Sequence, residues 1–338
     1  MSKERKSPGL LTLTFCIFVL GLFVLPPSPV LGEQKSFVLT PDLTLGADGG
    51  DENLLFSGIY AVGLDRDQNI YILDWWFTSP PRIQVFDSRG GFLQSIPLRQ
   101  GQGPGEATSV GELAVSPSGT IYVLDWGQNK IMLYDAKGAF LRQFKPEVQP
   151  SDFALLPGEQ VILLGASREK LLHVCDKDGR VLASYGEPFE LPAKLSQYKN
   201  MPFLCCPNRF NVGPDGRVYV LDPHRFEISI YRQGKLEGKV EGRSDAFSPM
   251  EVVTGGGGMG VGYPRVTALP SGDRLYVGVV RMASAKKGPN ELIIYEKGER
   301  VGAVTLEGWL KAIDAQGRLY FSEESDFPKM VRYVVRER

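Results

Sequence analysis

One phrase recurs six times along the 338-residue sequence, and it restricts the fold more than any other feature. Each copy has a short apolar strand, a turn that contains Gly or Pro, and a second apolar strand that usually carries Tyr and often ends in Asp. The copies cover residues 60–74, 113–125, 153–165, 210–222, 266–279 and 310–323. The regular turn signals and the enrichment in β-branched and aromatic residues predict a repeat protein built from short antiparallel strands.

Each copy extends into a set of strands that can form one sheet. A third strand follows the phrase in most copies, for example at 82–87 and 130–135, and a fourth follows a tight Gly turn, as at 90–96 and 138–144. Four antiparallel strands repeated six times predict an all-β fold, the six-bladed β-propeller with four-stranded blades. The expected blades lie near residues 58–98, 111–145, 152–186, 209–241, 265–306 and 309–336.

The last copy has three strands and needs a fourth from elsewhere in the chain. The stretch at 36–46 precedes the first copy and reads as a strand. An N-terminal strand that pairs with the last blade would close the ring and leave no open sheet edge at that point. The sequence therefore predicts a ring closed by residues 36–46.

Residues 1–32 have the layout of a secretory signal. Three basic residues within positions 3–6 precede an apolar run at 10–25, and prolines and the small residue Gly32 follow. This order is typical of an exported protein. We expect cleavage after Gly32, which would place residues 33–338 in the periplasm or outside the cell. The alternative is an uncleaved membrane anchor, since the run approaches the ~20 residues that span a bilayer.

Three cysteines follow the N-terminal segment: Cys175, Cys205 and Cys206. An odd number in an oxidising compartment leaves at least one thiol unpaired within the chain. Small buried thiols, a bridge from Cys175 to one of the neighbouring pair, and a vicinal disulfide all remain open. The chain has no Cys-x-x-Cys spacing, so neither a structural zinc site nor a c-type haem is expected.

The loop at 99–107 reads Arg-Gln-Gly-Gln-Gly-Pro-Gly-Glu-Ala. With the repeat, it makes the chain resemble NHL-type six-bladed propellers, particularly exported bacterial ones with an Arg-x-Gly-x-Gly-Pro-Gly-Glu-Phe-like first loop between blades. Ala107 replaces the aromatic residue of that pattern, and the third copy has Ile162 where most others have Tyr. The resemblance implies the fold over nearly the whole of 33–338. It leaves the activity open, because such families include binding scaffolds, lactonases and lyases.

The loops between the expected strands fall into two classes, one for each face of the ring. One class consists of tight turns, such as 116–119 and 213–216. The other class is long and covers 74–82, 99–112, 185–209, 222–227, 242–265 and 279–291. Long loops on a rigid scaffold are where binding usually occurs. We therefore expect the ligand at the long-loop face, with the Gly-rich stretch at 255–262 as a lid or spacer.

Alignment of the innermost strands by their distance from the repeated Tyr predicts one residue per blade at the mouth of the central channel. These residues are Ile59, Glu112, Asp152, Arg209, Arg265 and Leu310, with Lys311 beside the last. Such a mixed ring of acids and bases can hold a polar ligand or an anion through its guanidinium groups. The alternative is that Asp152 and Arg209 form a structural salt bridge.

Further candidates lie in the long loops around this mouth. They are Trp75, Trp76, Trp126, His224, Arg225 and Arg281. Aromatic faces beside guanidinium groups suit sugars, peptides and partner proteins. The alternative for the tryptophans is that they pack as lids between blades.

These features favour a non-catalytic binding or protein-interaction module without a cofactor, whose unknown partner is a protein, a peptide or a carbohydrate. The 38 basic and 39 acidic residues give no basic field for nucleic acid. Only two histidines are present, which argues against a three-His zinc site or a Ser-His-Asp triad.

The alternative is a cation-dependent hydrolase, lactonase or lyase of the gluconolactonase type. It would hold one calcium or another divalent cation with Glu112, Asp152 and Asn211, whose side chains supply oxygen ligands. Arg209 and Arg265 would oppose that cation.

Overall fold

The computed structural model describes residues 34–76, 80–165, 169–255, 258–281, 289–324 and 326–338. All of them lie in one compact unit, residues 33–338. The predicted export segment at 1–32 lies outside the described residues.

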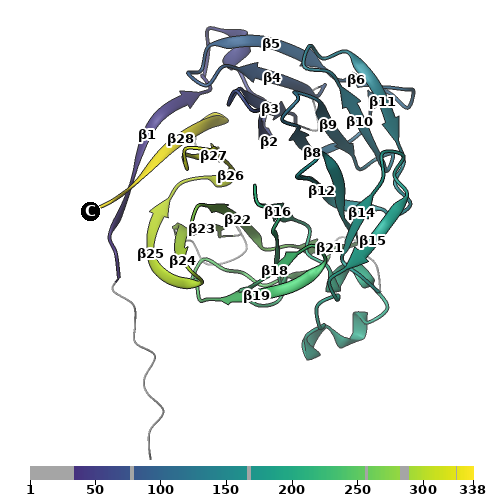
Figure 1. Cartoon of the computed structure of the whole chain (residues 1–338), viewed down its shortest axis with the longest axis vertical. Helices are drawn as coiled ribbons and strands as arrows, with labels where there is room; N and C mark the ends of the chain where they lie inside the picture. Colours follow the sequence, from purple (N-terminus) through teal and green to yellow (C-terminus); the bar gives the residue numbers. More distant parts are fainter. Residues whose placement is uncertain (1–33, 77–79, 166–168, 256–257, 282–288, 325) are drawn as a thin grey trace, which may run out of the picture. The chain divides into compact units, whose positions relative to one another are not determined.

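Six four-stranded antiparallel sheets are arranged in a ring (Figure 1), which confirms the predicted six-bladed β-propeller. Blade 1 consists of β2 (Ile59–Leu64), β3 (Ile70–Asp74), β4 (Arg82–Phe86) and β5 (Phe92–Pro97). Blade 2 consists of β8 (Val110–Val115), β9 (Ile121–Asp125), β10 (Lys130–Tyr134) and β11 (Phe140–Phe144). Blade 3 consists of β12 (Pro150–Leu156), β13 (Gln160–Gly165), β14 (Leu172–Cys175) and β15 (Val181–Tyr185).

The second half of the ring follows the same pattern. Blade 4 consists of β16 (Phe210–Val212), β17 (Val218–Leu221), β18 (Glu227–Arg232) and β19 (Lys235–Glu241). Blade 5 consists of β22 (Arg265–Ser271), β23 (Arg274–Val280), β24 (Asn290–Glu296) and β25 (Glu299–Leu306). Blade 6 consists of β26 (Trp309–Ile313), β27 (Leu319–Glu323), β28 (Lys329–Glu337) and β1 (Phe37–Leu45).

Strand β1 closes the ring in the predicted manner. It pairs with β28 in an antiparallel register that runs from Phe37 opposite Glu337 to Leu45 opposite Met330. An ion-pair network reinforces the closure, because Lys35 contacts Glu296 at 2.9 Å and Arg274 contacts both Glu296 and Glu337. The two ends of the described chain are thus fastened to each other and to blade 5.

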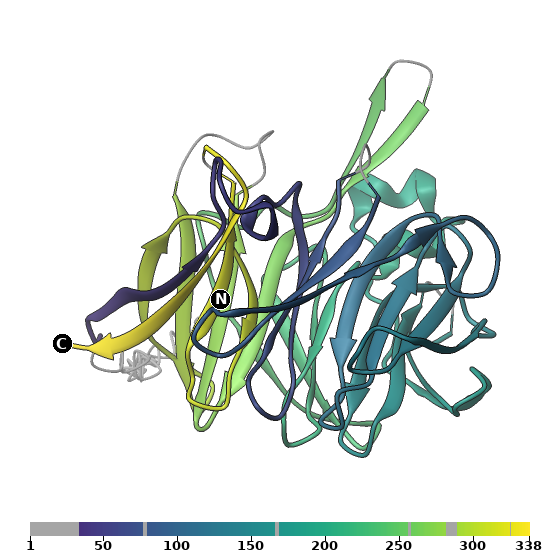
Figure 2. The ribbon, with the colours of Figure 1, turned by 90° about the horizontal axis from the view of Figure 1, so that it is seen from above.

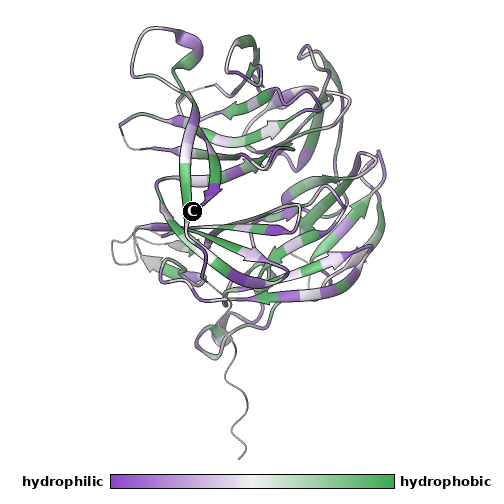
Figure 3. Ribbon diagram, turned by 60° about the vertical axis from the view of Figure 1, so that its left-hand side comes forward, coloured by the Kyte–Doolittle hydropathy of each residue, from purple (hydrophilic) through white to green (hydrophobic). Residues whose placement is uncertain are grey.

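The core lies between the blades. Strands β3 and β9 are buried along their whole length, and the clusters they join combine side chains of adjacent blades. Each sheet packs against a neighbour on both faces, which explains why the second strand of every copy is apolar instead of alternating. Figure 3 shows hydrophobic residues concentrated in the strands and hydrophilic residues in the turns.

Several short elements on the long-loop side lie outside the blades. A 3-10 turn, η1 (Glu52–Leu54), precedes blade 1, and two more, η2 (Ala193–Tyr198) and η3 (Pro202–Cys205), connect blades 3 and 4. Strands β20 (Glu251–Gly255) and β21 (Gly258–Gly262) pair as an antiparallel ribbon that extends beyond the ring (Figure 2). The Gly-rich stretch that we expected to be a lid or spacer therefore contributes to a β-ribbon.

The Asp that ends the repeated phrase is a structural residue. Asp74 accepts hydrogen bonds from the backbone N–H groups of Ser57 (2.8 Å) and Gly58 (3.2 Å). Asp125 accepts equivalent bonds from Thr108 and Ser109, both at 3.0 Å. Each carboxylate holds the loop that leads into the innermost strand of its own blade. The copies of blades 1 and 2 therefore end in Asp because this loop needs an acceptor.

The innermost strands carry β-bulges that change the predicted register at the channel. Extra residues interrupt the pairing between Ile59 and Ala61 in β2, Val110 and Glu112 in β8, Pro150 and Asp152 in β12, and Leu310 and Ala312 in β26. The position opposite the residue two places after the repeated Tyr, or after Ile162 in blade 3, is occupied by Ala61, Glu112, Asp152, Thr267 and Trp309.

The predicted equivalence of Ile59, Arg265 and Leu310 with Glu112 and Asp152 is therefore wrong. Strand β22 has no bulge and a shorter hairpin turn, while the bulge of β26 lies beyond Trp309 instead of before it. An insertion of one residue moves every later side chain to the other face of a strand, so equal spacing in sequence does not give equal placement.

Candidate functional site

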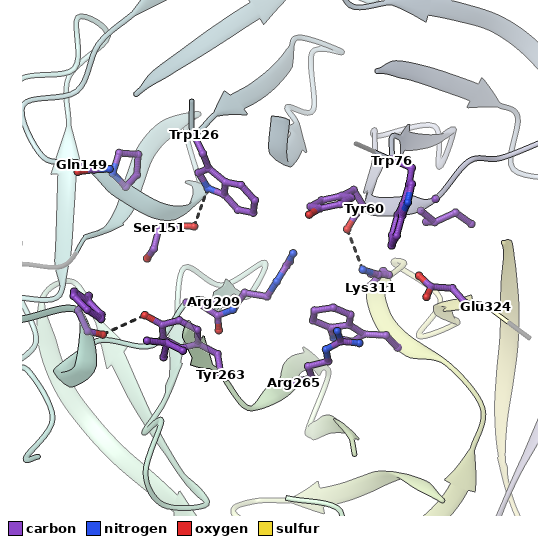
Figure 4. Close-up of a pocket in the computed structure, with 18 of the residues that line it drawn as sticks. Tyr60, Trp76, Trp126, Gln149, Ser151, Arg209, Tyr263, Arg265, Lys311 and Glu324 are labelled. Carbon is purple, nitrogen blue, oxygen red and sulfur yellow. Dashed lines mark hydrogen bonds between the residues drawn. The ribbon is translucent and has the colours of Figure 1, made fainter. Parts of the chain in front are cut away.

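A cavity of about 950 Å³ opens at the centre of the long-loop face (Figure 4). Its aromatic lining consists of Tyr60, Trp76, Trp126, Phe203, Tyr263 and Trp309. Its charged lining consists of Arg209, Arg265, Lys311 and Glu324. A second cavity of about 240 Å³ occupies the channel and shares Arg209 and Lys311 with the first. These two cations therefore separate the mouth from the channel.

Trp309 is the centre of the basic side of the cavity. The Lys311 ammonium lies 4.0 Å from the centre of its ring, and the guanidinium carbons of Arg209 and Arg265 lie at 4.9 and 5.3 Å. The indole Nε1 donates a hydrogen bond to Thr267 Oγ1 at 3.0 Å, which fixes the ring. An indole face attracts cations, so it gathers three positive groups that would otherwise repel one another.

Arg209 is paired on its channel side. Its Nη1 lies 2.7 Å from Glu112 Oε2, and both side chains are largely buried. Asp152 does not pair with Arg209, so the alternative of a structural salt bridge between these two residues is wrong. Asp152 instead accepts hydrogen bonds from the backbone N–H groups of Phe153 (2.9 Å) and Phe210 (3.1 Å). Burial raises the pKa of Asp152 well above its usual value, and the Glu112 charge raises it further.

Lys311 is a half-buried amine on the wall of both cavities. Its Nζ donates a hydrogen bond to the Tyr60 carbonyl oxygen at 2.9 Å. Burial lowers the pKa of Lys311 to about 7, and the positive charge of Arg209 acts in the same direction. Arg265 differs from both neighbours, because it is exposed and makes no hydrogen bond or ion pair with the described residues. Arg265 is thus available to a ligand at the mouth.

The opposite side of the cavity is aromatic and rigid. The ring centres of Tyr60 and Trp126 are 6.2 Å apart, and Trp126 Nε1 donates to the Ser151 carbonyl oxygen at 3.1 Å. The Trp126 ring lies directly over Gly111, where a Cβ atom would stand 2.1 Å from the indole Cε2. Tyr60 also packs against Trp75, with ring centres 5.3 Å apart. These contacts hold the aromatic wall in place.

The structure brings together only part of the predicted site. Trp76, Trp126, Arg209 and Arg265 line the mouth, and Glu112, Asp152 and Asn211 line the channel below it. Four other predicted residues line neither cavity: Trp75, His224, Arg225 and Arg281.

These four residues stabilise loops. Trp75 is buried between blades 1 and 2, and Arg281 bonds through its backbone N–H to the Asn290 side chain at 3.1 Å. His224 Nε2 lies 2.8 Å from the Leu204 carbonyl oxygen. Arg225 pairs with Asp222 at 3.2 Å. Their long-loop placement was correctly expected, but the loops direct these side chains to structural contacts.

Sequence reasoning missed Tyr60, Tyr263, Trp309 and Glu324. Tyr60 and Lys311 are the inserted residues of their bulges, and a bulge re-aims the side chain it adds. The available signal was Trp309 itself, since a Trp at the first position of an innermost strand departs from the other five copies.

The predicted metal ligands do not fit a divalent cation in this structure. Glu112 is bonded to the Arg209 guanidinium, both oxygens of Asp152 accept backbone hydrogen bonds, and Asn211 Oδ1 accepts from the Ala268 N–H at 3.2 Å. Within the described parts of the chain, no group of three His, Cys, Asp or Glu side chains is placed to hold a metal ion. The oxygens that would bind a cation are already used.

The Gly-rich loop at 99–107 is held by its own contacts. Glu106 Oε2 accepts from the Gly103 N–H at 2.8 Å, and the buried Lys130 ammonium donates to the Gly103 carbonyl oxygen at 3.3 Å. Strands β6 (Arg99–Gln100) and β7 (Glu106–Ala107) pair across it. The motif thus shapes a loop between blades and lies outside the cavity lining.

The three cysteines are free thiols, with Cys175 and Cys206 buried and Cys205 half-buried. Burial raises the pKa of Cys206 to about 12 and that of Cys175 to about 11. The sequence left three alternatives for these cysteines. The structure has the one in which the thiols form no disulfide. None of them lines the cavity.

Comparison with protein families gives the same fold. Residues 50–205 match the model of a family described as a 6-bladed beta-propeller. The chain is a propeller. None of the curated proteins compared with the sequence matches it.

Solved structures extend this likeness over most of the propeller. The chain is similar to a member of the DUF4221 family from Bacteroides vulgatus, with a TM-score of 0.61 and 12% sequence identity. The match covers 90% of this chain and 100% of the other. A proposed exported protein from Bacteroides fragilis gives a TM-score of 0.58 at 12% identity, over 89% of this chain and 95% of the other. A streptogramin B lyase gives a TM-score of 0.50 at 15% identity, and the match covers 89% of this chain and 98% of the lyase. At these identities the likeness shows the fold alone.

The described residues contain no helix that is long and apolar enough to cross a membrane.

Proposed function

We propose that this propeller is an exported binding module for a small anionic ligand that carries a planar or apolar group. The single observation behind the proposal is the arrangement of Arg209, Arg265 and Lys311 around the Trp309 ring. Arg265 is exposed at the rim, where its guanidinium can donate two parallel hydrogen bonds to a carboxylate. Among the described residues that line the mouth, Glu324 alone carries a negative charge.

The aromatic wall suits the rest of such a ligand. Trp76 and Trp126 are both exposed, at 48% and 36% of their surface, and they face the basic side across the cavity (Figure 4). Pockets for small molecules usually occupy about 300–1,000 Å³ and combine apolar walls with a few polar groups. The volume of about 950 Å³ is at the upper end of that range, so the ligand can be the size of a short peptide or disaccharide.

Export is supported by two separate observations. Residues 1–32 have the order of charges and apolar residues that a secretory signal requires. The similarity to a proposed exported protein points in the same direction. We therefore propose a periplasmic or extracellular location and keep the likeness to exported NHL-type propellers as part of this proposal.

Calorimetric titration with matched probes tests the binding proposal. Indole-3-acetate carries a carboxylate, and indole-3-acetamide has the same ring without the charge. We expect the acid to bind about 10-fold more tightly, because a charge-assisted hydrogen bond contributes ~1.5–3 kcal/mol. Arg265→Ala should remove this preference. Arg89→Ala, which changes an exposed arginine on the tight-turn face, is the matched control.

Equal affinity for acid and amide would contradict the proposal, as would equal losses in the two arginine variants. Arg225→Ala adds a second comparison, since Arg225 was expected in the site but does not line the cavity. It should behave as Arg89→Ala does. Binding of neutral sugars in preference to both probes would instead favour a carbohydrate module.

The cation-dependent enzyme is the less favoured alternative. The similarity to the lyase supports only the fold. The side-chain oxygens of Glu112, Asp152 and Asn211 already accept hydrogen bonds from other groups of the chain. Elemental analysis of protein purified without chelator tests it directly. One divalent ion per chain, lost in Glu112→Gln, would reverse the order of the two hypotheses.

A further inference from the structure

Lys311 occupies a position that anion binding alone does not explain. Two arginines already supply permanent positive charge at the mouth, and Lys311 lines both the mouth and the channel below it. A lysine that served only as a third cation would not need to be held, half-buried, between an indole ring and a backbone carbonyl group. We infer that Lys311 forms a reversible imine with an anionic aldehyde or ketone bound in this cavity. This inference rests on the proposed anion binding and names the class of the ligand.

The geometry leaves the amine able to react. Among the described residues, the one hydrogen bond made by Nζ goes to the Tyr60 carbonyl oxygen, 2.9 Å away. A neutral amine has two N–H bonds and a lone pair, so one donated hydrogen bond orients the nitrogen and leaves the lone pair unused. The Trp309 face at 4.0 Å covers one side of the amine. The remaining approach is from the cavity.

Charges around the amine favour its neutral form. Arg209 and Arg265 repel an ammonium, Glu112 and Glu324 attract it, and burial opposes the charge most strongly. Because the pKa of Lys311 is lowered to about 7, about half of the amine is neutral at pH 7, against roughly one part in 3,000 for an ordinary lysine. Lysines that form imines in enzymes are activated in this way, by desolvation and by neighbouring cations.

The condensation balances without an oxidant or a reductant. The lone pair of Nζ attacks the carbonyl carbon, and the π electrons of the C=O bond move to oxygen, which takes up a proton. The C–O bond of the resulting carbinolamine then breaks while the nitrogen lone pair forms the C=N bond. One water molecule leaves, with both of its hydrogens supplied by the amine, and hydrolysis reverses the reaction.

Neighbouring groups can assist each part of this reaction. Arg265 can bind the ligand carboxylate and Arg209 can stabilise negative charge on the carbonyl oxygen, since both flank the same indole ring. Glu324 lies beside Lys311 at the edge of the cavity (Figure 4) and can relay a proton between nitrogen and oxygen. An anionic carbonyl compound is therefore the ligand class for which every charged group of the mouth has a use.

Trapping with three matched probes tests the inference. Phenylglyoxylate has a ketone and a carboxylate, mandelate has the carboxylate without the ketone, and acetophenone has the ketone without the carboxylate. The full mature chain is incubated with each probe and sodium cyanoborohydride at pH 7, then analysed by intact mass and peptide mapping. We expect one phenylglyoxylate adduct per chain, on Lys311, and at least 10-fold less adduct with acetophenone.

Two variants test whether the adduct depends on Lys311. Lys311→Arg should abolish the adduct, because a guanidinium group stays protonated and does not condense with the ketone. Lys137→Arg, which changes an exposed lysine on the tight-turn face, should leave the adduct unchanged. In the unmodified chain the trapping rate should rise from pH 6 to pH 8 and then level off. A surface lysine would show a rate that continues to rise above pH 9.

Each remaining outcome contradicts a specific claim. If mandelate binds and no adduct appears on Lys311, the imine is wrong and the anion-binding proposal stands. If neither mandelate nor phenylglyoxylate binds and no adduct appears, both proposals are wrong. Adducts spread over many lysines, at the same level in Lys311→Arg, would show only the general reactivity of amines and would also overturn the inference.

Discussion

The two faces of the ring use their charged residues differently. On the tight-turn face, Asp87 accepts hydrogen bonds from the backbone N–H groups of Arg89 (2.7 Å) and Gly91 (2.9 Å). The same two bonds recur at Asp135, Asp176 and Asp314. At the mouth, by contrast, Arg265 has no polar partner among the described residues, and Lys311 makes one hydrogen bond.

This difference distinguishes residues that build the fold from residues that are available for binding. The carboxylate that recurs in turns of blades 1, 2, 3 and 6 meets the same need in each, namely an acceptor for the N–H groups of the turn. The residues of the mouth do not repeat, since Ala61, Glu112, Asp152, Thr267 and Trp309 occupy one equivalent position. In a repeat protein of this kind, departures from the repeat indicate the site more reliably than the repeat does.

The largest effect is expected when a repeated carboxylate is removed from a buried position. Asp125→Ala should lower the free energy of unfolding by about 3 kcal/mol, because Asp125 is buried and several half-buried donors lose their acceptor. Those donors include the backbone N–H groups of Thr108, Ser109 and Gly127. Urea denaturation followed by circular dichroism measures the change.

Asp135→Ala is the matched control for this prediction. It removes the same type of carboxylate from an exposed turn, so the cost should stay below about 1 kcal/mol. Equal losses in the two variants would show that burial does not distinguish the two faces. Arg265→Ala should leave the unfolding free energy unchanged within error, because its side chain is exposed.

A smaller loss is expected when the ion pair beneath the mouth is broken. Glu112→Gln removes the charge 2.7 Å from Arg209 and should cost about 2 kcal/mol, a value between those of exposed and fully buried pairs. The pKa of Asp152 should fall, because the Glu112 charge raises it, but burial should keep it above its ordinary value. Denaturation and a titration of the Asp152 carboxyl by NMR measure the two effects.

The double variant Glu112→Gln with Arg209→Met separates the pair from its surroundings. It should recover part of the lost stability, since neither charge is then left without a partner. If Glu112→Gln alone is as stable as the unmodified chain, the pair does not support the mouth.

The aromatic wall should respond to a single methyl group. Gly111→Ala places a Cβ atom 2.1 Å from the Trp126 indole, so the ring must move. We expect a loss of about 1–2 kcal/mol and weaker binding of indole-3-acetate, because overpacking displaces a lining residue. Tryptophan fluorescence and calorimetry measure both. Gly238→Ala, where no atom lies within 4 Å of the new Cβ, should change neither.

Most of the fold could be predicted from the sequence, because each blade repeats one set of physical requirements. The apolar second strands and the tight turns follow from packing and from turn chemistry, and the closing strand at 37–45 follows from the need to pair the edge of β28. The long-loop face could also be predicted, from loop length alone.

The site could be predicted only in part, because it depends on side-chain direction. Bulges turn Tyr60 and Lys311 toward the cavity, and spacing in the sequence does not reveal an inserted residue. Trp75 and Trp76 show the same limit, since one of these neighbours is buried at 4% exposure and the other is exposed at 48%. Neighbouring residues of an extended chain point to opposite sides. A shift of one residue therefore moves a side chain from the lining of the cavity into the hydrophobic core.

The smallest expected effect concerns the pH dependence of the tight-turn face. The N–H groups of Gly91 and Arg89 lower the pKa of Asp87 in the folded state. Asp87 therefore contributes stability at pH values above the pKa that it has in the unfolded chain. This contribution is lost as the pH falls from the unfolded-state pKa of Asp87 through its lower folded-state pKa. Asp87→Asn cannot titrate, so its unfolding free energy should decline less on acidification below about pH 4. Arg265→Ala should decline in parallel with the unmodified chain, because it leaves every carboxylate of the tight-turn face in place. Parallel decline of Asp87→Asn as well would mean that the backbone bonds of the turn do not distinguish the two protonation states. The difference between the two faces, with carboxylates that bond to their own turns on one and available cations on the other, would then be supported only by the residues of the mouth.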